Sequence, residues 1–122
     1  MESIPDLHDA SIIGIAFNSS TNELALRIEI EGNYSILLCS ETLGWTLSPF
    51  ERQNVIFEIR LHEAATIPAH LVAELPAEYV RAMEQMGLKC IEISPSVGLG
   101  GFVIARSLRY SDAGQEVALQ TG

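Results

Sequence analysis

The clearest feature of the chain is a strict alternation of apolar and polar residues between Asn22 and Glu31. Aliphatic side chains occupy every second position of this segment, at Leu24, Leu26, Ile28 and Ile30. A period of two is typical of a β-strand, because successive side chains point to opposite faces of a sheet. The segment therefore predicts a strand with one buried face and one solvated face.

The same alternation continues on both sides of this segment. Before it, residues 13–17 alternate, and the polar run at 18–21 has the composition of a turn between two paired strands. After it, Gly32-Asn33 predicts a two-residue hairpin turn, because both residue types tolerate positive φ. A third strand is then expected over residues 34–38.

Two more alternating runs follow, at residues 43–47 and 55–61. Pro49 ends the first of them, because proline cannot donate a hydrogen bond to a β-ladder. The first half of the chain thus predicts an antiparallel meander of five strands.

In the middle of the chain the period changes to that of a helix. Pro68 and Pro76 suit the first turns of helices, and Gly87 suits the position just beyond a helix end. The apolar positions on one helical face are Tyr79, Val80, Met83 and Met86. We expect a short helical turn over residues 69–74 and a longer helix over residues 76–86.

Strand character returns at residues 88–94 and 102–109, which a glycine-rich hairpin loop at 95–101 connects. The predicted fold class is α+β: a mainly antiparallel β meander of about seven strands, arranged as a sandwich or a partly open barrel, with one helix inserted before the last hairpin. Residues 1–110 are expected to form a single α+β domain, and residues 111–122 a flexible C-terminal tail.

Composition narrows the classes of function. With 48% apolar and 19% charged residues, the chain is not of a disordered class. Sixteen acidic and seven basic residues give a net charge of −9, which disfavours a nucleic-acid partner and favours a basic protein partner. The apolar surplus also predicts a subunit interface, so self-association as a homodimer is a second expectation.

The compartment is expected to be the cytoplasm. The N-terminal residues lack the cationic and apolar regions of a secretory signal, and no segment approaches the roughly 18 apolar residues of a membrane span. No membrane partner is therefore predicted. Cys39 and Cys90 lie far apart in apolar segments, which favours free buried thiols in a reducing compartment over a disulfide.

Three polar residues, His8, Asp9 and Asn54, stand out as candidate binding residues near the predicted strands. His8 and Asp9 come just before the first strand, where they can act together only if the segment turns, because neighbours in a strand face opposite ways. Without a site, Asp9 would cap a turn and His8 would pack at the margin of the sheet. Asn54 follows a sharp loop and is expected to bond the backbone there, or else to serve as a polar anchor at the mouth of the sheet.

A histidine cluster is the main alternative to a purely structural role for these residues. His62 and Glu63 end the fifth predicted strand, and His70 follows in the helical turn. Together with His8 and Asp9 they could suit zinc, although the short paired spacing of a helix-borne HExxH motif is absent. Since no serine has the setting of a nucleophile elbow either, we predict no catalytic residue, no metal site and no cofactor. The alternative is a small ligand-binding or metal-dependent enzyme that uses a His/Asp/Glu cluster at one end of the sheet.

Three short segments resemble those of a loose group of small uncharacterised bacterial proteins. They are Leu7-His8-Asp9-Ala10, Gln53-Asn54-Val55-Ile56 and Ile91-Glu92-Ile93-Ser94-Pro95-Ser96. Some relatives of that group are thought to act as immunity proteins of toxin systems. The resemblance implies a mainly β domain that works by binding, with His8, Asp9 and Asn54 near its site. We therefore predict a small cytosolic, non-enzymatic and immunity-like interaction domain that binds a basic protein, with His8, Asp9, Asn54 and His62 as candidate binding residues.

Overall fold

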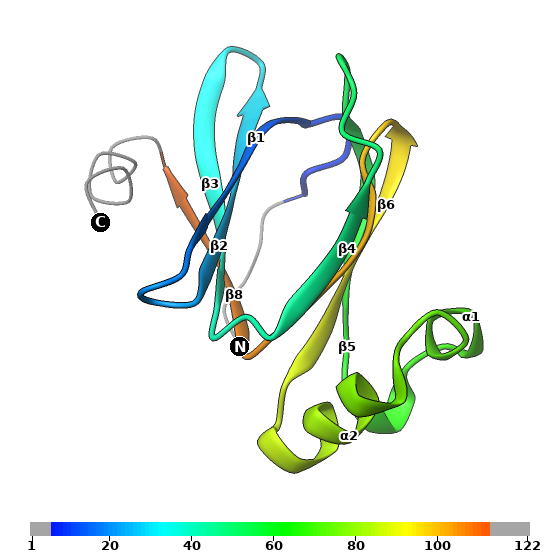
Figure 1. The fold of residues 1–122 in the computed structure, drawn as a ribbon. Coiled ribbons are helices and arrows are strands. Elements are labelled where there is room, and N and C mark those ends of the chain that lie inside the picture. Colours follow the sequence, from blue (N-terminus) through cyan, green and yellow to red (C-terminus); the bar gives the residue numbers. More distant parts are fainter. Residues whose placement is uncertain (1–5, 113–122) are drawn as a thin grey trace.

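The computed structural model describes residues 6–112, and within them eight strands form one antiparallel sheet (Figure 1). The strands are β1 (Ser11–Asn18), β2 (Glu23–Ile30), β3 (Asn33–Ser40), β4 (Gly44–Ser48), β5 (Val55–His62), β6 (Lys89–Val97), β7 (Gly100–Ala105) and β8 (Ser107–Asp112). A 3-10 turn, η1 (Ala64–Thr66), and two helices, α1 (Ala69–Val72) and α2 (Ala77–Met86), lie between β5 and β6. The predicted α+β class with antiparallel pairing is confirmed.

The sheet is open and consists of two halves that face each other (Figure 1). Its strand order is β4-β7-β6-β5-β1-β2-β3-β8, so β4 and β8 are the edges. The halves join between β5 and β1, where the ladder consists of the single pair Ser11 and Val55. Close to it, the Ile12 amide donates to the Asn54 carbonyl at 2.7 Å. This narrow join lets the two halves diverge on either side of it.

The predicted five-strand meander is wrong for β4, which pairs with β7 and not with β3 or β5. The chain turns away from β3 at Glu41, whose φ is 48°, and the Leu43 amide then donates to the Ile104 carbonyl at 2.8 Å. The predicted last strand breaks at the same corner, where the Arg106 amide donates to Ser40 and separates β7 from β8. The chain therefore crosses twice from one half of the sheet to the other at this corner, between β3 and β4 and between β7 and β8.

Two local details of the predicted strands also differ. A β-bulge between Ile12 and Gly14 places an extra residue in β1, so Ile12 is buried and Ile13, predicted to share the buried face, is exposed. The turn between β2 and β3 consists of Glu31 and Gly32, with φ values of 50° and 80°, rather than of Gly32 and Asn33 as predicted. Asn33 is instead the first residue of β3.

Two apolar clusters hold these elements together. The larger one fills the space between the halves and includes the predicted buried face of β2, with Leu24, Leu26 and Ile28 almost completely inaccessible. The smaller one packs the helices onto the opposite face of β6 and β7, where Met83 meets Phe102 and its neighbours. Burial of these side chains supplies the main driving force for folding.

The helical insert agrees with its prediction in order and place, but α1 ends at Val72 rather than at residue 74, and η1 precedes it without having been predicted. Helix α2 begins after Pro76 and ends at Gly87, which adopts a φ of 69° as expected for a residue beyond a helix end. Met86, predicted on the apolar face, is exposed. In the described residues no helix is long and apolar enough to cross a membrane.

The end of the described chain extends the predicted domain. Strand β8 continues to Asp112, so the first two residues of the predicted tail belong to the sheet. The rest of that tail, residues 113–122, lies outside the described residues.

Candidate functional site

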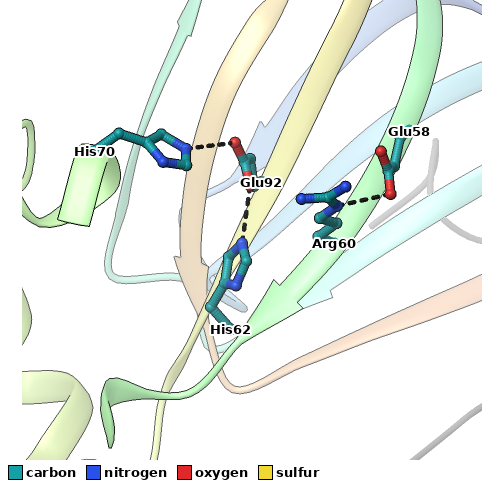
Figure 2. A network of polar contacts seen from close by, with 5 residues as sticks. All are labelled: Glu58, Arg60, His62, His70 and Glu92. Atoms are coloured by element: carbon teal, nitrogen blue, oxygen red, sulfur yellow. Dashed lines mark hydrogen bonds and ion pairs between the residues drawn. The ribbon is translucent and has the colours of Figure 1, made fainter. Parts of the chain in front are cut away.

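A cluster of polar side chains lies where α1 meets the outer face of the sheet (Figure 2). Glu92 of β6 is bound by two imidazoles at once: His62 Nε2 lies 2.8 Å from Oε1, and His70 Nε2 lies 3.2 Å from Oε2. The side chains of His62 and Glu92 are only 12% and 14% exposed, whereas that of His70 is 62% exposed. The cluster thus joins β5, β6 and α1.

The register of the sheet explains this meeting. Arg60 is the ladder partner of Glu92, and Cys90 is the partner of His62, so all four side chains point to the face that carries the helices. Arg60 also pairs with Glu58 on the same strand, with its Nε 2.7 Å from the carboxylate (Figure 2). The alternation that sends the neighbouring apolar residues into the core sends these charged groups outward.

The surroundings of Glu92 favour its charged form. Burial on its own would raise the pKa of this carboxyl, but the hydrogen bonds and positive charge of His62 and His70 together bring the pKa below its ordinary value. Glu92 is therefore a carboxylate at neutral pH. In neutral imidazoles this arrangement requires the proton on Nε2, which leaves Nδ1 as the acceptor.

A thiol next to this cluster could suggest a nucleophile, but its environment makes it inert. Cys90 is completely buried, and burial together with the negative charge of Glu92 raises its pKa to about 12. Cys39 is also buried, with a pKa of about 12 caused by burial. Because a thiolate is the reactive form, neither cysteine is suited to attack a substrate at neutral pH. Both are free, as predicted.

The cluster has the chemistry of a structural connection. Both imidazoles direct Nε2 at one carboxylate, and among residues 6–112 no group of three or more histidine, cysteine, aspartate or glutamate side chains is placed to hold a metal ion. What the geometry does provide is two hydrogen bonds to a charged group: the bond from His62 joins β5 to β6, and the bond from His70 joins α1 to the sheet.

The structure does not bring His8 and Asp9 to this cluster. The segment does turn, since Asp9 has a φ of 72° and the Ala10 amide donates to the Leu7 carbonyl. His8 Nδ1 lies 3.4 Å from the Asp9 carboxylate, with both side chains well exposed, and the His8 ring packs edge-on against Phe57 at 5.3 Å. Phe57 and His62 are separated by roughly 16 Å along the strand at the usual rise per residue. The convergence of His8, Asp9 and His62 required by the alternative is therefore absent among the described residues.

Asn54 is buried and bonds the backbone, as the sequence predicted. Its Oδ1 accepts from the amides of Glu51 and Leu99 at 2.9 and 3.0 Å, and its Nδ2 donates to the carbonyls of Glu51 and Ile12. Gly98, with a φ of 77°, packs so closely on Asn54 that a side chain would not fit. A single amide thus holds together β1, the loop before β5 and the turn between β6 and β7.

Three large apolar side chains of β1 and β4 face the core side of the sheet but remain partly exposed to solvent. Ile15 and Phe17 pair with the buried Leu26 and Leu24, and Trp45 pairs with the buried Val103, so all three lie on the core side of the sheet. They are nevertheless 38%, 40% and 38% exposed. The rings of Phe17 and Trp45 touch, with centroids 4.9 Å apart. We call this set, Ile15, Phe17 and Trp45, the β1–β4 seam.

Sequence reasoning missed both Glu92 and the β1–β4 seam. For Glu92 a signal exists, because a charged residue between Ile91 and Ile93 must face away from the core. For the seam no local signal exists, because Ile15 and Trp45 have the alternation of buried residues. Their exposure depends on which strands are neighbours.

Comparison with known proteins adds no further assignment. The chain matches no protein-family model, no curated protein and no solved structure. The resemblance to immunity-type proteins therefore remains a prediction.

Proposed function

We propose that this chain is a non-enzymatic interaction domain that binds a cationic protein partner. The observation that carries the proposal is the β1–β4 seam, where two aromatic rings and an aliphatic side chain on the core side of the sheet stay about two-fifths exposed. Aromatic residues are enriched among those that dominate binding energies at protein interfaces. Trp45 is the natural anchor of such an interface.

The charge of the chain supports a basic partner. A net charge of −9 attracts a cationic protein over distances of about a Debye length and raises the association rate at low salt. The resemblance to immunity-type proteins makes a toxin the class of partner to test first. Free, buried Cys39 and Cys90 support action in the cytoplasm, where thiols stay reduced.

The alternative, an enzyme with a His/Asp/Glu cluster at one end of the sheet, has less support. Of its proposed members, His62 and His70 meet at Glu92, beside the buried Cys90, whereas His8 and Asp9 form a separate pair. This cluster suits the docking of α1 better than the binding of a substrate.

Affinity capture from a bacterial lysate tests the proposal when it is followed by measurement with the purified partner. We expect the wild-type chain to retain a protein of basic isoelectric point at low salt, and the purified pair to associate more slowly as salt rises. Trp45→Ser should lose this partner, whereas Phe57→Ser, which removes an exposed aromatic ring outside the seam, should keep it. Capture that does not depend on salt concentration contradicts the proposal. Capture by the Trp45→Ser variant that equals capture by the wild type contradicts it too.

A further inference from the structure

Two strand edges beside the β1–β4 seam carry backbone groups that have no ladder partner within residues 6–112. On its side away from β2, β1 pairs with β5 only at Ser11, and its last backbone bond there is the one from Ile12 to Asn54. Within the described chain, no segment other than β2 pairs with residues 13–18. Strand β4 pairs with β7 on one side and is the edge of the sheet on the other. Both edges therefore offer N–H and C=O groups to an incoming strand.

The edges of β1 and β4 lie close to each other at one end. The contact between Phe17 and Trp45 brings the end of β1 close to the start of β4, and Figure 1 shows the two strands in facing halves of the sheet. Figure 1 also shows the two strands running in opposite directions. A single added strand would therefore be antiparallel to one of them and parallel to the other.

We propose that the β1–β4 seam binds an extended cationic segment of a partner protein as an added β-strand. This inference rests on the proposed function and specifies how the partner is held. Backbone hydrogen bonds to the free edges provide affinity, and alternate apolar side chains of the segment cover Ile15, Phe17 and Trp45. The intervening side chains of the segment point to solvent and carry its positive charge.

Either a second copy of this chain or a cationic segment of another protein could supply such a strand, and the net charge of the chain favours the cationic segment. A second copy of this chain would bring another net charge of −9 to the first, which opposes association. A lysine- or arginine-containing segment would instead be attracted. The partner is thus a different protein, and the length of β4 limits the paired segment to about five residues.

A synthetic octapeptide with alternating valine and lysine serves as the probe. Titrated into the full chain at low salt, it should change the fluorescence of Trp45, the single tryptophan. It should also slow hydrogen exchange about tenfold at amides within residues 13–18 and 44–48. High salt should weaken the binding. Trp45→Ser should reduce the protection, whereas Phe57→Ser should preserve it.

A peptide with the same side chains but methylated backbone amides separates strand addition from simple attraction. The inference predicts that this peptide loses the protection, because it cannot donate to a strand edge. If it binds as well as the parent peptide, the strand-addition inference is wrong while the proposed function stands. Protection confined to β8, or no binding of the parent peptide, also overturns the inference. Protection that appears without peptide as the chain dimerises would identify a second copy as the occupant and contradict it too.

Discussion

At the residue scale, the buried amide of Asn54 joins β1, the loop before β5 and the turn between β6 and β7. Its position after a sharp loop predicted an amide that bonds the backbone, and it makes four such bonds. Its most distant partners, Ile12 and Leu99, could not be named in advance, since both depend on tertiary contacts 42 and 45 residues away. The chemistry of the residue was predictable, but its place at a junction of three segments was not.

Replacement of this amide should therefore be costly. We expect Asn54→Ala to lower the free energy of unfolding by about 3 kcal/mol, because two amides and two carbonyls lose a partner in a buried setting. Urea denaturation measures the change. Asn33→Ala, at an exposed asparagine of β3, is the matched control and should stay within about 0.5 kcal/mol of the wild type. Equal midpoints for the two variants would mean that the junction is unimportant.

At the element scale, alternation predicts which segments are strands but not which strands are neighbours. β4 satisfies its apolar pattern equally well beside β3 or beside β7, and the choice depends on the corner formed at residues 41–43 and Arg106. The bulge at Ile12 likewise changes which residues of β1 face the core, and the pattern of residue types does not reveal it. The His70 side chain of α1 bonds to Glu92 of β6. The place of Glu92 is set by its pairing with β5, which lies about thirty residues earlier in the chain and could not be predicted from local sequence.

The docking of α1 should depend on pH through Glu92. Because the folded chain lowers the pKa of this carboxyl, its contribution to stability is present above the ordinary glutamate value of about 4.3 and is lost as the pH falls through the lower, folded value. Glu92→Gln should therefore be less stable than the wild type by about 1 kcal/mol near neutral pH, and the difference should shrink in acid. Urea unfolding across this range measures it. Glu84→Gln, an exposed site on α2, is the control, and a Glu92→Gln difference that is constant with pH would contradict the assignment.

At the scale of the whole molecule, the open sheet creates the feature on which the proposed function depends. The two halves enclose a well-buried core, but among residues 6–112 no strand pairs with the outer side of β4 or with residues 13–18 on the side of β1 away from β2. Ile15, Phe17 and Trp45 remain accessible on the core side. The apolar surplus in the sequence predicted an interface, and we propose that this interface lies at the seam. The proposed partner is cationic because the net charge of −9 attracts such a protein.

Acrylamide quenching of Trp45 tests this claim most directly, because the chain has no other tryptophan. We expect acrylamide to quench the indole readily in the free native chain. The quenching constant should fall severalfold when the chain is saturated with the cationic protein captured at low salt. An indole that is already shielded in the free chain, or one whose quenching is unchanged in the complex, would contradict it.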